Sequence, residues 1–179
     1  RQTGYVWSGL IALSFLQSGD MIATFGYNTA SKNSEKTGQM RLSLAGKEVA
    51  AVNFHSSVRW LTNSPAISSL GAKGFSGVKD IFEINYAEEY CGGAMNSEFI
   101  FLTEGNKLVH VHTSSEGSDV PVFASEKRIF PDDAGGKPNS IRVKREFGEI
   151  NDDGEEVINE REDYWLKWDG KTMKKANKQ

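Results

Sequence analysis

The sequence predicts an all-β protein, an antiparallel sandwich or barrel of about eight or more short strands with little helix. Apolar and polar residues alternate in several segments, as where Met40, Leu42 and Leu44 alternate with polar neighbours. Turn signals recur about every 8–12 residues, which is typical of all-β folds. No window of about 11 or more residues keeps its apolar positions at helical spacing. A propeller-like meander is the alternative, although a chain of 179 residues would supply only about four blades.

The N-terminal half is predicted to hold four strands in two hairpins, formed by residues 5–16, 21–27, 39–44 and 47–54. The first hairpin turns at the polar residues 17–20, and the second turns at Ala45-Gly46. The connection 62–77 holds Pro65 and three glycines, and it is a candidate weak domain boundary. Residues 81–90 are the best helical candidate because they are rich in glutamate, a good helix former.

The C-terminal half is predicted to hold six shorter strands, at residues 99–102, 107–111, 120–123, 127–130, 141–147 and 164–168. Polar or glycine-containing turns separate them, notably at residues 103–106, 132–139 and 151–154. The pair Asp169-Gly170 is the strongest short hairpin signal in the chain. Residues 171–179 carry four lysines and no acid, and we expect this basic tail to fray into solvent.

Composition indicates one β-rich globular domain over residues 1–179. The net charge of −3, from 21 basic and 24 acidic residues, gives no basic excess for a nucleic-acid partner. The longest apolar stretch, residues 5–16, is too short to span a bilayer and lacks the flanks of a signal peptide. We therefore expect a strand pair there and no transmembrane segment. Cys91 is the only cysteine, which excludes an internal disulfide and favours a buried apolar role over a thiol nucleophile.

His110 and His112 form an H-x-H pair on a predicted strand, which would place both imidazoles on one face about 7 Å apart. With Glu116 four residues later, the segment H-V-H-T-S-S-E resembles the metal motif of cupin-fold proteins. This resemblance implies a transition-metal site, to which His55 would be the remaining histidine. Phe123 stands where the motif has a glycine, and the second motif of the family is missing. The alternative interpretation places the neighbouring valines in the core and both histidines in water.

Residues 149–160 carry oxygen-bearing side chains with the spacing of a cation-binding loop, namely Glu149, Asn151, Asp153, Glu155 and the terminal Glu160. With Gly154 for the sharp turn, the segment resembles the acidic calcium loops of EF-hands and of secreted bacterial β-repeat proteins. This resemblance implies calcium as a cofactor. Residues 149–163 hold eight acids and one base, a crowding that a cation would relieve. The alternative is a solvated hairpin turn with acidic edges.

Tyr164, Trp165 and Trp168 are candidate ligand-binding residues. On a strand, Tyr164 and Trp168 would share one face and Trp165 would point to the other. Exposed aromatics on a flat sheet hold carbohydrates or peptides by stacking. The alternative is that most of these rings pack in the core.

The sequence thus predicts a non-catalytic binding or structural module of an extracytoplasmic bacterial protein, periplasmic or secreted, with calcium as a stabilising ion. Its expected partner is a carbohydrate or another protein. Three histidines and one cysteine, without a recognisable catalytic spacing, favour binding over acid–base chemistry. The alternative is a metal-dependent, cupin-like enzyme that uses His110, His112 and Glu116.

Overall fold

The computed structural model describes residues 6–7, 10–28, 36–56, 65–88, 93–119 and 121–176 of the chain. Over these ranges the backbone forms thirteen β-strands and no helix, which confirms the predicted all-β class. Several strands are longer than predicted, and β12 alone has 13 residues. None of the described residues belongs to a helix of the length and apolarity that crossing a membrane requires.

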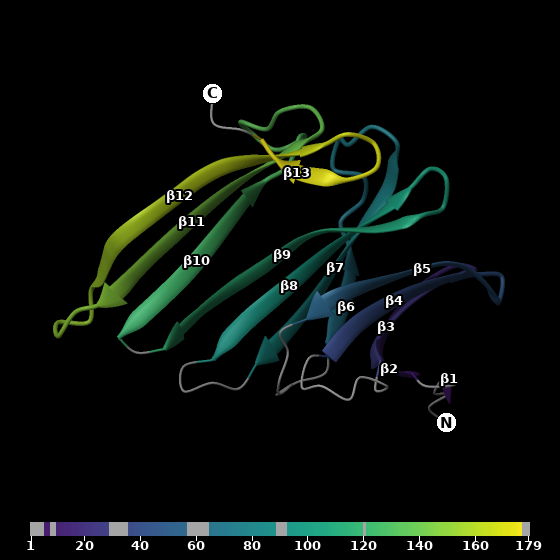
Figure 1. Ribbon diagram of the computed structural model, residues 1–179, viewed down its shortest axis with the longest axis horizontal. Helices are drawn as coiled ribbons and strands as arrows, with labels where there is room; N and C mark the ends of the chain where they lie inside the picture. Colours follow the sequence, from purple (N-terminus) through teal and green to yellow (C-terminus); the bar gives the residue numbers. More distant parts are fainter. Residues whose placement is uncertain are drawn as a thin grey trace.

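The strands form two antiparallel sheets in which the order of the strands follows the chain (Figure 1). The small sheet contains β1 (Val6–Trp7), β2 (Leu10–Ser18), β3 (Met21–Asn28), β4 (Lys36–Leu44) and β5 (Lys47–Ser56). The large sheet contains β6 (Ala66–Ser69), β7 (Val78–Glu88), β8 (Ala94–Thr103), β9 (Leu108–Asp119), β10 (Val122–Ile129), β11 (Ser140–Ile150), β12 (Glu156–Trp168) and β13 (Met173–Lys175). The arrangement is a sandwich of two meanders.

Tight turns join the strands where the sequence predicts them. At the β4–β5 turn, Ala45 and Gly46 both have positive φ, 49° and 77°, which is the backbone of a two-residue hairpin turn. At the β12–β13 turn, the Asp169 carboxylate accepts hydrogen bonds from the backbone N–H groups of Thr172 and Lys171, at 2.8 and 2.9 Å. These bonds hold the pKa of Asp169 well below its usual range.

Three predicted elements are corrected by the structure. The helical candidate at residues 81–90 overlaps β7, because Phe82, Ile84 and Tyr86 alternate with polar residues and all three are buried. The pieces at 120–123 and 127–130 overlap one strand, β10, which pairs with β11 along its whole length. The basic tail contributes β13, whose Met173 pairs with Trp168, so this part of the tail does not fray.

Two apolar cores lie on the two faces of β8, because successive side chains of a strand point to opposite faces. Ile100 and Leu102 belong to the first core, and Phe99 and Phe101 belong to the second. The first core lies between the two sheets and includes Phe25, Met40, Leu42 and Phe54 of the small sheet with Ile67, Phe82, Ile84 and Tyr86 of the large sheet. The second core joins β7 and β8 to β11 and β12 through Ile81, Ile141, Val143, Leu166 and Trp168.

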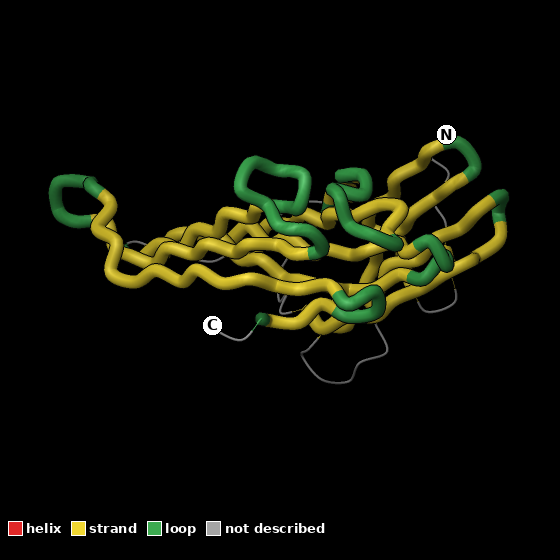
Figure 2. The backbone as a smooth tube through the Cα atoms, turned by 90° about the horizontal axis from the view of Figure 1, so that it is seen from above, coloured by secondary structure: helices red, strands yellow, loops and turns green. Residues whose placement is uncertain are grey.

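The large sheet divides between β9 and β10. These strands pair at only three positions, from Asp119↔Val122 to Gly117↔Ala124, whereas β10 pairs with β11 at eight. Beyond these three positions β9 and β10 diverge (Figure 1), which leaves two half-sheets, β6–β9 and β10–β13. The second core lies between the half-sheets. Seen from above in Figure 2, the turn that joins β11 to β12 projects at one end of the molecule.

Candidate functional site

A β-bulge in β9 separates the two predicted metal-binding histidines. His110 pairs with Ile100 and His112 pairs with Phe99, so Val111 is an extra residue without a partner in β8. Because Phe99 and Ile100 are consecutive, their partners lie on opposite faces of the sheet. The prediction that both imidazoles share one face is therefore wrong. In the alternative interpretation, Val109 and Val111 face the core, and both do pack against the second core. The histidines do not simply face water, because each bonds a buried glutamate.

His110 belongs to a polar cluster beneath the small sheet. Its Nε2 lies 2.8 Å from Oε2 of Glu98, a carboxylate with no exposed surface. Glu98 also accepts hydrogen bonds from the hydroxyl groups of Tyr86, at 2.8 Å, and Thr113, at 2.7 Å. The ring of Phe54 stacks on the imidazole with centroids 4.9 Å apart. Three hydrogen bonds therefore compensate a carboxylate that would be costly to bury alone.

His112 belongs to a second cluster, which lies between the half-sheets. Its Nε2 lies 2.8 Å from Oε1 of Glu126 on β10, and Arg145 Nε donates to the other oxygen at 2.7 Å. Burial raises the pKa of Glu126, but the hydrogen bonds and charges of His112 and Arg145 outweigh burial. The net effect holds the pKa of Glu126 below its ordinary value of 4.5. The guanidinium of Arg128 lies 4.7 Å from the centroid of the Phe99 ring.

The predicted set His110, His112 and Glu116 is not brought together. Glu116 lies 3.7 Å from Arg128, and each histidine has its own glutamate. The side chain of His55, the remaining candidate, lies outside the described residues, as does Cys91. Among the described side chains, no group of three or more His, Cys, Asp or Glu is arranged to hold a metal ion.

The predicted calcium loop is a hairpin turn between β11 and β12. The Asn151 side-chain oxygen accepts hydrogen bonds from the backbone N–H groups of Asp153, at 3.1 Å, and Glu155, at 2.8 Å. Gly154 takes the positive φ of 80° that the turn needs. Glu149 lies in β11 and Glu160 in β12, so only the central residues of the set share the turn. The amide oxygen of Asn151 is thus engaged by the backbone, whereas the carboxylates of Asp153 and Glu155 are exposed.

The three predicted aromatic residues divide between the core and the surface. Trp168 is 3% exposed and packs edge-on against Phe101 in the second core, with ring centroids 5.1 Å apart. Tyr164 and Trp165 are partly buried, and cations lie over both rings. Lys175 Nζ is 3.9 Å from the centroid of Tyr164, and Lys137 Nζ is 4.6 Å from that of Trp165. Core packing therefore accounts for Trp168 and for part of Tyr164, which packs against the second core. Tyr164 and Trp165 remain candidate ligand contacts.

A groove of about 1060 Å³ runs beside β12 and contains both of these rings. Six consecutive residues of β12, from Glu160 to Trp165, line it. Its other lining residues are Lys137, Pro138, Ser140, Lys167, Lys175 and Ala176. Burial raises the pKa of Tyr164, the charge of Arg145 opposes the rise, and the charges of Glu126 and Glu162 add to it, so the net shift is upward.

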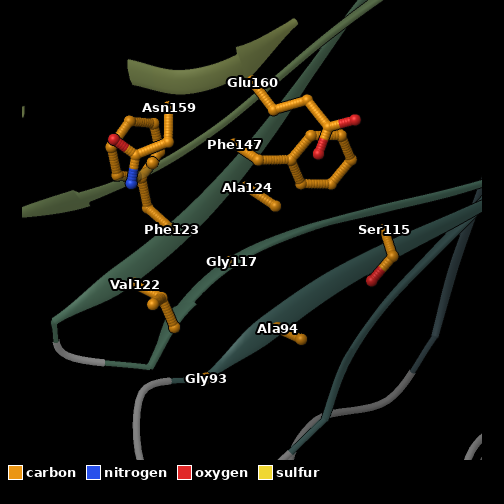
Figure 3. Close-up of a pocket in the computed structure, with 11 residues that line it drawn as sticks. Gly93, Ala94, Ser115, Gly117, Val122, Phe123, Ala124, Phe147, Asn159 and Glu160 are labelled. Carbon is orange, nitrogen blue, oxygen red and sulfur yellow. The ribbon is translucent and has the colours of Figure 1, made fainter. Parts of the chain in front are cut away.

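A smaller trough of about 510 Å³ lies at the end of the large sheet where β9 and β10 pair (Figure 3). Many of the residues that line it are small and come from four neighbouring strands or their ends, namely Gly93, Ala94, Gly117, Ala124 and Gly148. Larger side chains that line it include Phe123, Phe147 and Glu160. Glu160 lines both hollows, so the trough lies next to the groove.

Comparison of the chain with protein-family models, with curated proteins and with solved structures finds no match. The proposed function therefore rests on the geometry of this chain.

Sequence reasoning missed the two buried glutamates. Glu98 directly precedes the apolar run 99–102, and a charged residue in a buried strand signals a hydrogen-bonded partner. Glu126 has no such signal, because Lys127 and Arg128 follow it and the local sequence is typical of a solvated strand.

Proposed function

We propose that the protein is a non-catalytic binding module whose ligand lies in the groove beside β12. The observation that carries this proposal is the groove itself, which has a volume of about 1060 Å³ and contains Tyr164 and Trp165. A hollow of this size can hold a ligand. Its lining combines two aromatic rings with seven charged side chains, which suits a polar or charged ligand. The trough offers fewer recognition groups because much of its lining is small.

The polar clusters support a binding role over an enzymatic one. His110 and His112 each face a glutamate with no exposed surface, so both imidazoles have structural partners. A cupin-like metal enzyme would need both imidazoles around one ion, and the bulge at Val111 opposes that arrangement.

We place the module in an extracytoplasmic bacterial setting, periplasmic or secreted, with the turn between β11 and β12 as its calcium site. The charge of residues 149–163, eight acids against one base, supports an ion there. Calcium loops of extracellular modules bind at about 0.1 to 1 mM, a concentration found outside cells.

Glycan and peptide arrays probed with wild type and with Trp165→Ala test the proposal. We expect at least one ligand that wild type retains and that Trp165→Ala loses by about tenfold or more in affinity. Lys127→Ala, an exposed change on β10 outside the groove, is the matched control and should bind as wild type does. The proposal would be contradicted if every array ligand bound wild type and Trp165→Ala equally well, or if no array ligand bound wild type.

A further inference from the structure

The groove beside β12 follows the open edge of a strand. Side chains at consecutive positions of a strand point to opposite faces, so consecutive residues line one hollow only where it runs along the edge. Six consecutive residues, from Glu160 to Trp165, line this groove. Figure 1 shows β12 as the last long strand of the large sheet, with the short β13 beside only one of its ends.

Part of this edge has unpaired backbone groups. β13 pairs with β12 from Leu166 to Trp168, and Ala176 N–H then donates to Trp165 C=O at 2.7 Å. Backbone groups alternate in direction along a strand, so the N–H and C=O of Asp163 and Arg161 point the same way as those of Trp165. Within the described part of the chain, no strand pairs with β12 on this side before Trp165. An unpaired row of this kind can accept an added strand.

The charged side chains along the β12 edge determine which side chains an added strand should carry. On one face, Arg161 and Asp163 already have partners, because Arg161 bonds Glu146 at 2.9 Å and Asp163 bonds Arg142 at 2.7 Å. On the other face, Glu160 and Glu162 form no salt bridge within 4.0 Å among the described residues. Glu162 lies opposite Arg145 on β11 and interacts with its charge, and Lys175 lies opposite Leu166 further along the same face. An added strand therefore meets two carboxylates at alternate positions. Opposite charges in directly facing positions stabilise such a pair of strands.

The same glutamates oppose pairing of β12 with a second copy of itself. An antiparallel pair centred on residue 160 sets Glu160 against Glu160. One centred on residue 162 sets Glu162 against Glu162, and it also sets Arg161 against Asp163, which already bond Glu146 and Arg142 on β11. The register between them sets Glu160 against Glu162 and Arg161 against Arg161. Like charges in facing positions destabilise a strand pair, so the edge favours a different chain as its partner.

We infer that an extended segment of a partner protein, with Lys or Arg at two alternate positions, adds to β12 as an antiparallel strand and continues the line of β13. This inference rests on the proposed function, because it names the ligand of the same groove. The main-chain bonds supply affinity, and the two cations facing Glu160 and Glu162 supply specificity.

Titration of the protein with a nine-residue peptide of alternating Lys and Thr tests this inference by calorimetry. We expect saturable binding that weakens at least about tenfold when alternate peptide amides are N-methylated, because methylation removes main-chain donors but keeps the charge. The double variant Glu160→Lys/Glu162→Lys should lose the Lys peptide and gain the corresponding Glu-Thr peptide. That exchange of preference also shows that the variant is folded.

Three results would overturn the inference. Equal binding of the methylated and unmethylated peptides would mean that charge alone attracts the peptide. A wild-type dimer whose dissociation constant changes in Glu160→Lys/Glu162→Lys would make a second copy of this chain the partner. Absence of peptide binding, together with a glycan that requires Trp165, would refute strand addition and leave the binding function of the groove intact.

Discussion

The side chains of His112 and Glu126 meet across the split in the large sheet, with Nε2 and Oε1 2.8 Å apart. β9 and β10 no longer pair at this level, so the contact joins the two half-sheets by side chains in place of backbone bonds. Arg145 of β11, in the same half-sheet as Glu126, donates a hydrogen bond to the other oxygen of this carboxylate. The second core joins the same half-sheets through apolar contacts. The angle between the half-sheets is thus set by one apolar and one charged cluster.

We predict that Glu126→Gln lowers the free energy of unfolding by about 1–3 kcal/mol at pH 7, because it removes the charge facing Arg145. The pKa of Glu126 is lowered in the folded state, so the carboxylate stabilises the fold above its unfolded value of about 4.5. This stabilisation is lost as the pH falls below that value through the folded-state pKa. Urea unfolding between pH 7 and pH 3 should therefore show the two proteins converging in acid.

The exposed Glu104→Gln is the control for this titration, and it should change stability by less than about 0.5 kcal/mol at every pH. A constant difference between wild type and Glu126→Gln down to pH 3 would show that the charge of Glu126 does not stabilise the fold.

We predict that replacing His110 and His112 together by Ala costs about 2–5 kcal/mol, because each change leaves a buried glutamate short of a partner. Histidines that merely faced water would cost no more than about 0.5 kcal/mol. Chemical denaturation of the single and double variants measures the difference. His112→Gln keeps a hydrogen-bond donor, so it should be more stable than His112→Ala. Equal free energies of unfolding for these two variants would mean that the cost comes from the lost packing of the imidazole ring.

The sequence predicted the hairpins because their signals are local. Ala45-Gly46 and Asp169-Gly170 each turn the chain where alternating strands begin and end. The same alternation predicted that Tyr164 and Trp168 share a face, and the structure confirms it, because both lie with Leu166 at the second core. Strand class and turns therefore depend on neighbouring residues alone.

The bulge and the split could not be predicted in this way. The segment V-H-V-H alternates regularly from Val109 to His112, so nothing in it indicates the extra residue that moves the histidines to opposite faces. The divergence of β9 from β10 depends on the second core, whose members come from strands distant in sequence. The bulge appears only in the pairing of β9 with β8, and the split depends on packing between distant strands, so neighbouring residues indicate neither feature.

We predict that Gly148→Ala costs about 1–3 kcal/mol, because a Cβ there would collide with the backbone oxygen of Val157 and the ring of Phe123. Gly148 lies at the bulge where β11 and β12 shift register. Gly105→Ala is the matched control, since its Cβ would meet only Thr103 Oγ1, at 3.9 Å. Equal thermal stability of the two variants would mean that the bulge can relax around a methyl group.

The last prediction concerns the acidic turn between β11 and β12. Asp153 and Glu155 are exposed on this turn, and repulsion among its carboxylates raises the free energy of the folded loop without an ion. A calcium ion stabilises the folded state by RT ln(1 + [L]/Kd), which amounts to at most about 1–2 kcal/mol at millimolar calcium for a weak site. We therefore expect a small rise in Tm with calcium, measured by differential scanning fluorimetry, that a chelator reverses. Asp153→Ala should abolish the rise, and Asp132→Ala, an exposed acid in the loop before β11, should keep it. Magnesium should do less, because its rigid octahedral shell suits a flexible turn poorly. If wild type and Asp153→Ala melt alike in calcium and in chelator, the turn binds no ion and Asn151 alone holds its shape.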